Sequence, residues 1–316
     1  MIMKKYMTLA MLAVASFTFN ACSNDDIEIS GNTVVTVSPK SVITPFIGNQ
    51  VTNELLSFDS NSFRLRTRVL VYNEDGMLVE QVTENLQNYE ATLRKELNLS
   101  FGVNYTMITI TDVFDANSAS ESSEYWHMSG ESNISQLRLE YVKKNVQTDG
   151  FVRKNGILGI GKDVVKIEKG GSEINLSPKP AGSLLRLSYE GIKSMSDVTQ
   201  LGATTDWIPG YVTFDREGNH TLVAAEPGYK VTGNYTYIDL FNTTTATSSS
   251  RISYYFAFPS AQSKNYFRTV YYVGNSGTLK SPIEASLVEG GEYELSIDLS
   301  SAADIRSVVP TLRKVN

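Results

Sequence analysis

Short segments in which apolar and polar residues alternate with a period of two recur along this chain. The clearest covers residues 292–299, whose two alternating sets are Tyr293, Leu295, Ile297 and Leu299, and Glu292, Glu294, Ser296 and Asp298. Successive side chains of a β-strand point to opposite faces, so this period is typical of a strand with one buried face. We therefore predict an all-β chain.

Glycine-rich turn signals separate the alternating segments, for example at Gly76, at Gly218 and at Gly290-Gly291. Many short strands separated by turns are typical of β-sandwiches. Strands are expected at 33–37, 64–72, 77–82, 89–99, 102–111, 134–142, 157–160, 163–167, 173–176, 183–189, 211–214, 220–224, 235–241, 252–258, 267–273 and 291–299. Residues 89–99 also fit a helix face, and only 51–56 and 302–308 are otherwise expected to be helical.

The chain of 316 residues is long enough for two ordinary domains. The polar run at 143–149 is the predicted linker, although the boundary could fall as late as Pro178. We expect a lipoprotein signal peptide at 1–21, a tether at 22–32, an N-terminal β-sandwich at 33–148 and a C-terminal β-sandwich at 149–316. Gly102 and Tyr105 have the same spacing as Gly290 and Tyr293, which favours two related sandwiches.

The first residues have the pattern of an export signal. Lys4 and Lys5 precede an apolar run at 6–19, which is shorter than the roughly 20 residues that span a bilayer. Ala21 then precedes Cys22, a pair that resembles the bacterial lipobox. We expect cleavage before Cys22 and acylation of this residue with palmitate or a similar chain. The alternative is a plain secretory signal with a chance cysteine.

The predicted location is the cell outer membrane, with the protein held by its lipid and facing outward. Asp25 and Asp26 follow Cys22 and resemble the surface-export signal of Bacteroidota lipoproteins. Cys22 is the only cysteine, so its acylation leaves no thiol for a disulfide or a metal. The net charge of −6 argues against nucleic acid as a partner.

No catalytic constellation is evident, and we predict a protein that is not an enzyme and needs no cofactor or metal. The two histidines, His127 and His220, form no His-Glu-x-x-His motif, and there is no Gly-x-Ser-x-Gly elbow. Residues 156–162 have the spacing of a phosphate-binding loop, but Asp163 stands where such a loop needs Ser or Thr. A glycine-rich turn and strand is the better interpretation.

Two groups of side chains are candidates for ligand binding. Tyr125 and Trp126 lie in a serine-rich segment at 115–133 and could stack on a sugar ring. The alternative is a loop that one aromatic residue pins into the core. Arg64, Arg66 and Arg68 share one face of a predicted strand, and we interpret them as a solvated face rather than an anion-binding stripe.

The lipobox, the segment Val-Leu-Val-Tyr-Asn-Glu-Asp-Gly at 69–76 and the Gly-x-x-Tyr entry to the Thr/Ile strand at 102–111 together resemble the fimbrillin-like lipoproteins of Bacteroidales. That resemblance implies two tandem transthyretin-like or Ig-like β-sandwich domains. It also implies a role as a fimbrial anchor or accessory subunit, in fimbria assembly or cell adhesion.

In that family, shaft subunits polymerise when one subunit donates a strand to its neighbour's sheet. Here the resemblance gives residues 33–37 and 308–315 as the strands to be donated or vacated. Trimming at an arginine is doubtful, because the first arginine after Cys22 is Arg64, inside a predicted strand. The expected partners are therefore membrane lipid, fimbrial subunits and host or glycan ligands. The alternative function is a surface glycan-binding lipoprotein of a polysaccharide-utilisation system.

Overall fold

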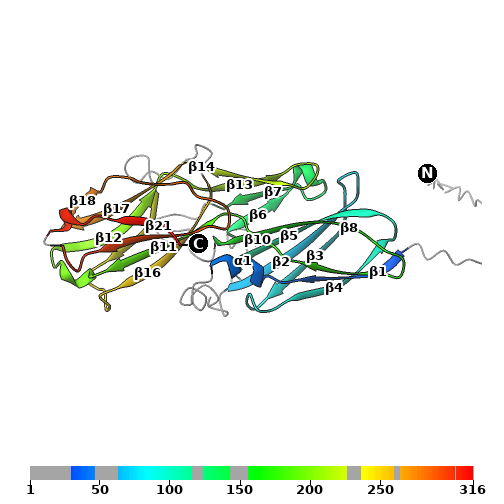
Figure 1. Ribbon diagram of the computed structural model, residues 1–316, viewed down its shortest axis with the longest axis horizontal. Coiled ribbons are helices and arrows are strands. Elements are labelled where there is room, and N and C mark those ends of the chain that lie inside the picture. Colours follow the sequence, from blue (N-terminus) through cyan, green and yellow to red (C-terminus); the bar gives the residue numbers. More distant parts are fainter. Residues whose placement is uncertain are drawn as a thin grey trace, which may run out of the picture.

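The computed structural model describes residues 30–46, 63–115, 124–142, 156–225, 236–259, 264–302 and 304–315. Within these residues the chain consists mainly of β-strands arranged in five sheets, so the predicted all-β class is confirmed. Figure 1 shows an elongated molecule, with strands of the first half at one end and most strands of the second half at the other.

The first half contains a three-stranded and a five-stranded sheet that pack face to face. In the smaller sheet β1 (Ser30–Val37) lies between β4 (Leu93–Ser100) and β9 (Ser172–Leu176). The larger sheet has the order β10 (Lys179–Pro180), β8 (Leu158–Lys166), β5 (Asn104–Asp115), β2 (Phe63–Tyr72) and β3 (Leu78–Leu86). The apolar core between them includes Val35, Val37, Val69, Val71, Leu97 and Met107.

The other face of the five-stranded sheet is also covered. A four-stranded sheet lies over it, in the order β14 (His220–Ala225), β13 (Ile208–Phe214), β7 (Arg138–Tyr141) and β6 (Trp126–Ser129). Ile108 of β5 shares a buried cluster with Leu139 of β7 and Val212 of β13. A Cβ added at Gly218, in the β13–β14 turn, would lie 3.1 Å from the Ile108 side chain. The hairpin therefore packs directly on β5.

The second half forms a sandwich from two further sheets. One has the order β16 (Arg251–Ala257), β11 (Ser183–Glu190), β20 (Glu292–Asp298) and β21 (Thr311–Lys314). The other has the order β15 (Thr236–Asn242), β12 (Val198–Thr205), β17 (Asn265–Val273) and β18 (Ser276–Leu279), with β19 (Ile283–Ala285) also paired to β17. The predicted inward set on β20 is confirmed, because Tyr293, Leu295, Ile297 and Leu299 are all buried.

Helical segments are short in the part of the chain that the structure describes. They are α1 (Lys40–Ile43), η1 (Thr44–Phe46), η3 (Ile134–Gln136), η5 (Ile192–Ser194) and η6 (Ile305–Ser307). The last falls within the predicted helical stretch 302–308, whereas residues 51–56 lie outside the described ranges. None of these helices is both long and apolar enough to cross a membrane.

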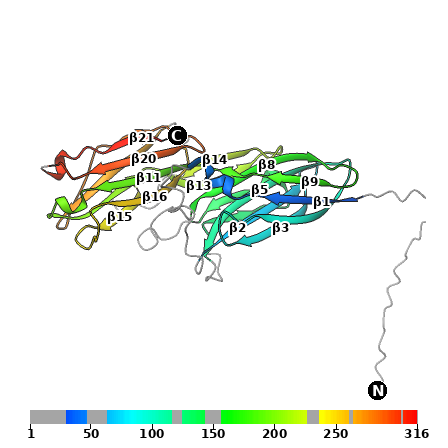
Figure 2. The same ribbon diagram turned by 60° about the horizontal axis from the view of Figure 1, so that its bottom comes forward.

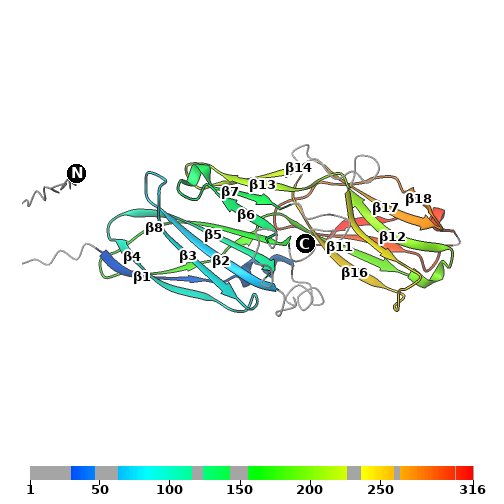
Figure 3. The ribbon, with the colours of Figure 1, turned by 180° about the vertical axis from the view of Figure 1, so that it is seen from behind.

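The strand ladders of the first half continue to Pro180. β8 pairs with β5, β9 pairs with β1, and β10 pairs with β8. The β13–β14 hairpin, which comes later in the chain, returns to pair with β7, and Figure 3 shows the two hairpin strands beside β7 and β6. We therefore propose to divide the chain after Pro180, at the late end of the range that the sequence left open, with this hairpin belonging to the first half.

The glycine–tyrosine spacing that links the two halves has one shared geometry. Gly102 and Gly290 both have a φ of 74°, which glycine adopts without steric cost. In each half the tyrosine hydroxyl accepts a hydrogen bond from the N–H of the residue two places before the glycine. The two pairs are Ser100–Tyr105 and Val288–Tyr293, each at 3.1 Å.

The arginine row on β2 is not a solvated face, so that prediction was wrong. The side chains of Arg66 and Arg68 are only 12% and 5% exposed. Both bind Asp112 of β5, at 2.6 and 3.0 Å, and Arg66 also binds Glu124. The reason is the four-stranded sheet that contains β6, which covers the outer face of the five-stranded sheet. The alternating sequence pattern alone would leave that face exposed to water.

Trp126 connects the two halves of the molecule. Its ring is fully buried and stacks on Phe258, which follows β16, with ring centroids 5.3 Å apart. It meets Tyr141 edge-on at the same distance, and its Nε1 donates a hydrogen bond to the Gly156 carbonyl at 2.9 Å. Large aromatic side chains bury much apolar surface, so this contact stabilises the junction.

We predict that Trp126→Ala lowers the free energy of unfolding by about 3–5 kcal/mol, because the substitution leaves a large cavity and removes a buried hydrogen bond. The matched control is His127→Ala, a neighbour whose side chain is 47% exposed and whose loss should change stability by less than about 1 kcal/mol. Urea titrations of both variants measure the difference, and equal unfolding midpoints would contradict the assignment.

Candidate functional site

The structure does not support a binding site at the predicted aromatic pair. Trp126 is fully buried and Tyr125 is partly buried against the same core. The indole therefore offers no exposed face on which a sugar ring could stack, and the prediction of a sugar platform there was wrong. Trp126 instead anchors its segment in the core, which was the alternative interpretation of the sequence. Cys22, the predicted lipid attachment site, lies outside the described residues.

The ionic cluster of Arg66, Arg68, Asp112 and Glu124 is internally balanced, with two cations and two carboxylates. Burial acts to raise the pKa of Glu124, but the hydrogen bond and charge of Arg66 outweigh it and leave that pKa below its usual value. Asp112 is fully buried and accepts hydrogen bonds from both arginines. Because each charge faces an opposite one, the cluster holds β2 and β5 to the segment before β6 rather than forming an anion-binding stripe.

No group of three or more His, Cys, Asp or Glu side chains in the described ranges is placed to hold a metal ion. The surfaces left to examine are therefore the edges of the sheets and the cavities. Of the two strands that the family resemblance singles out, β1 lies inside its sheet, where it pairs with β4 on one side and with β9 on the other. Val35 and Val37 of β1 are buried, so removing β1 would break two ladders and a core.

β21 differs from β1 in every one of these respects. It is four residues long, forms the edge of its sheet and pairs with β20 alone. Its side chains are exposed except for the partly buried Leu312. Figure 2 shows β21 outermost beside β20 and β11. An edge strand presents unpaired N–H and C=O groups on its free side, and such an edge can pair with another chain.

One charged contact reinforces the attachment of β21. Arg313 donates from Nε to the Glu294 carboxylate of β20 at 2.8 Å, and Arg186 of β11 lies 3.7 Å from the same carboxylate. Glu292 and Glu294 are on the outward face, as predicted, yet they are only 2% and 6% exposed. Burial raises the pKa of Glu292. The outer face of β20 is thus an acidic strip that prefers a cation on the strand beside it.

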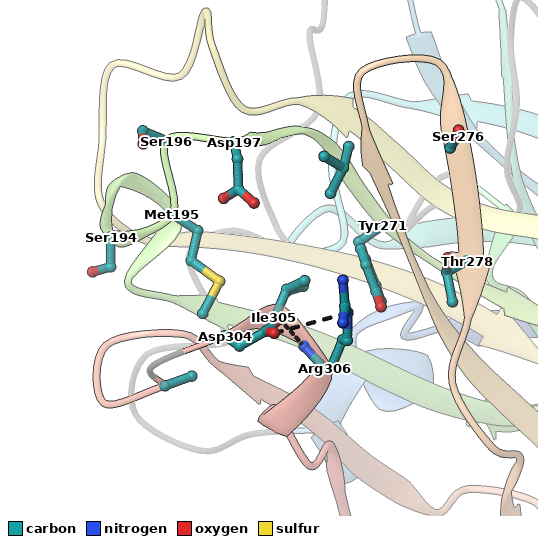
Figure 4. Close-up of a pocket in the computed structure, with 12 residues that line it drawn as sticks. Ser194, Met195, Ser196, Asp197, Tyr271, Ser276, Thr278, Asp304, Ile305 and Arg306 are labelled. Carbon is teal, nitrogen blue, oxygen red and sulfur yellow. Dashed lines mark hydrogen bonds and ion pairs between the residues drawn. The ribbon is translucent and has the colours of Figure 1, made fainter.

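A cavity of about 520 Å³ opens at the end of the second half, remote from β1. Three separate parts of the chain form it: the turn at 194–197, the β17–β18 hairpin, and Ala302 with residues 304–306 (Figure 4). We call it the distal cavity and define it by Met195, Asp197, Tyr271, Asp304, Ile305 and Arg306. Nothing in the sequence pattern predicts it, because each segment has the composition of an ordinary turn.

Similarity to known proteins is structural. No family model matches the chain, and no curated protein matches its sequence. A candidate adhesin from Bacteroides thetaiotaomicron superposes with a TM-score of 0.50 at 13% identity, covering 91% of this chain and 98% of its own. The chain shares that protein's fold.

Two further solved structures are similar at lower scores. A fimbrial assembly protein from Parabacteroides distasonis has a TM-score of 0.48 at 9% identity and covers 90% of this chain and 96% of its own. A fimbrial anchor protein from Porphyromonas gingivalis has a TM-score of 0.47 at 11% identity, with coverages of 90% and 97%.

The contact between Arg313 and Glu294 predicts a local effect. Arg313→Ala should raise the hydrogen-exchange rate of β21 amides about fivefold, since an exposed charged hydrogen bond contributes about 1 kcal/mol. Lys314→Ala, which removes a neighbouring exposed cation without an ion pair in the described structure, is the control. Exchange measured by mass spectrometry distinguishes them, and equal protection in both variants would show that the ion pair does not hold the strand.

Proposed function

We propose that this chain is a lipid-anchored surface protein that acts in fimbria assembly or cell adhesion through β-strand pairing, as an anchor or accessory subunit. The observation that carries the proposal is β21, a short edge strand attached on one side only. The shared fold with a candidate adhesin, and the fimbrial proteins among the similar structures, agree with this class of function.

β21 is the better of the two candidate strands for exchange between subunits. Releasing it would break one ladder, which pairs residues 311–314 with 293–296, and would expose little core, because its side chains are already largely in water. The site that it leaves would be the edge of β20, with Glu294 placed to bind a cation on an incoming strand. Arg64 lies inside β2, so trimming at that arginine would cut a paired strand.

The tether places the molecule relative to the membrane. Cys22 precedes β1, and Figure 1 shows β1 at one end of the elongated body. Two or more acyl chains hold a protein firmly, since each buried methylene contributes about 0.8 kcal/mol. In this arrangement the first half lies nearer the outer membrane, and the second half, with β21, projects away from it.

We predict that deleting residues 308–316 removes fimbrial subunits from the set of proteins that co-purify with the tagged chain from the outer membrane. Arg216→Ala, an exposed substitution in the β13–β14 turn, should leave that set unchanged. A synthetic peptide of residues 308–316 should bind the deletion variant and not the intact chain, because only the variant has a free β20 edge. The peptide arm tests the strand itself, independently of any partner.

An unchanged set of partners together with no peptide binding would contradict strand pairing at β21. A scrambled peptide of the same composition controls for charge, since the acidic strip on β20 would attract any basic peptide weakly.

The anchor has its own test. Metabolic labelling with a palmitate analogue should tag the wild-type protein, and Cys22→Ala should abolish the tag because no other thiol exists in the chain. The same variant should leave the outer-membrane fraction, since the acyl chains supply the membrane affinity. Labelling that persists in Cys22→Ala would contradict the proposed attachment site.

A further inference from the structure

The outer edge of β20 is longer than the strand that covers it (Figure 2). β20 runs over Glu292–Asp298, whereas β21 pairs only with residues 293–296, and the Val315 N–H adds one bond to the Glu292 carbonyl at 2.8 Å. On the β21 side, no described residue pairs with Ile297 or Asp298. This end of the edge therefore keeps backbone groups that a longer strand could pair.

Pro310 is the reason that β21 begins no earlier than Thr311. If the register of β21 continued, Pro310 would lie opposite Ile297 and Val309 would lie opposite Asp298. Proline has no N–H to donate, so it ends a ladder of backbone hydrogen bonds. Val309 lies outside the ladder and is 78% exposed. The chain's own strand thus fills the edge only in part.

The middle of the edge selects a cation on the strand beside it. The Glu294 side chain is only 7% exposed, and Arg313 Nε donates to its carboxylate at 2.8 Å. Arg186 of β11 lies 3.7 Å from the same carboxylate, which is too far for a hydrogen bond. A nearly buried carboxylate that loses its hydrogen bonds is costly. A strand that replaces β21 must therefore bring a donor opposite Glu294.

The neighbouring positions on the edge extend this requirement. Residues directly opposite each other in an antiparallel pair have their side chains on the same face. Asp298 is exposed and shares the outward face with Glu294, so a second cation can pair with it. Leu295 and Ile297 face the core, and Leu312 already packs there opposite Leu295. From its amino to its carboxyl end, the best strand therefore reads basic, apolar, any residue, apolar, basic.

The chain's own segment meets this pattern only in its last two positions, because residues 309–313 read Val-Pro-Thr-Leu-Arg. A second copy would bring the same short strand, while each copy holds its own β21 at a high effective concentration within one chain. Exchange between identical copies therefore gains no new contact. We propose that the β20 edge accepts, in place of β21, a longer antiparallel strand of this pattern from a different subunit, which rests on the strand pairing proposed above.

The test measures the affinity of labelled peptides for the intact mature chain in detergent micelles by fluorescence anisotropy. The matching peptide is residues 308–316 with Val309→Arg and Pro310→Val, and the charge-reversed peptide carries Arg313→Glu in addition. The matching peptide should bind at least about tenfold more tightly than either the unaltered or the charge-reversed peptide, because it alone both extends the ladder and pairs with Glu294.

The role of Glu294 is tested by the ratio of the affinities of the matching and charge-reversed peptides for one protein. β21 competes equally with both peptides, so this ratio does not depend on how firmly β21 is held. Glu294→Gln keeps the shape of the side chain and should lower the ratio about fivefold, because a neutral amide distinguishes the two charges poorly. Glu96→Gln, an exposed change on β4, should leave the ratio unchanged. Circular dichroism confirms that both variants fold.

Equal affinities of the matching and charge-reversed peptides, or an unchanged ratio in Glu294→Gln, would overturn the proposed pattern and leave strand pairing itself intact. Failure of every peptide, including the unaltered one on the variant that lacks residues 308–316, would overturn the strand pairing as well. Light scattering of the Cys22→Ala chain alone should show a monomer. Dimers that disappear when residues 308–316 are removed would assign the edge to a second copy and contradict a different subunit as the partner.

Discussion

The return of the β13–β14 hairpin onto the first half is the contact on which the rest of the structure depends. By packing on β5 it closes the second face of the five-stranded sheet, and it carries the chain back from the second sandwich to the first. On this covered face Arg66 and Arg68 are almost out of water and pair with Asp112, while Glu124 and the Trp126 carbonyl bind Arg66 from the segment beside β7. Trp126 lies at the same junction, stacked on Phe258, so that one buried cluster runs through both halves.

The local alternation of apolar and polar residues was enough to predict most of the strands, including the inward face of β20. Each of these segments shows the period of two within its own sequence. The pattern failed to predict features of the structure that depend on contacts with residues distant in the sequence. The cover over Arg66 comes from the segment at Glu124 and Trp126, which β2 itself does not announce. β12 was missed because Gly202 interrupts its pattern, and a Cβ there would lie 2.2 Å from the Asp239 carbonyl oxygen of β15. The distal cavity joins three turns that carry no signal of their own.

The two halves of the molecule differ in how firmly β1 and β21 are held in their sheets. β1 is paired on both sides and buried, so in the proposed lipid-anchored protein it would transmit a load from the membrane into the body without leaving its sheet. β21 is short, exposed and attached through one ladder and one reinforcing ion pair. Exposed edge strands can pair with other chains, and proteins cover or charge these edges where such pairing is unwanted. The weak protection of β21 is therefore the feature that favours contact with another chain.

The carboxyl end of the chain lies near the middle of the body rather than at either pole (Figures 1 and 3). A fluorescent protein or epitope fused there would sit beside the junction, flank β21 and compete with any strand arriving at that edge. A reporter of surface display is better inserted at Gly170 in the β8–β9 turn, where an added Cβ meets nothing within 4 Å and the neighbouring Gly171 lies against Asn32 of β1, at the other end of the body. The choice of fusion point thus decides whether a labelled protein still behaves as the native one.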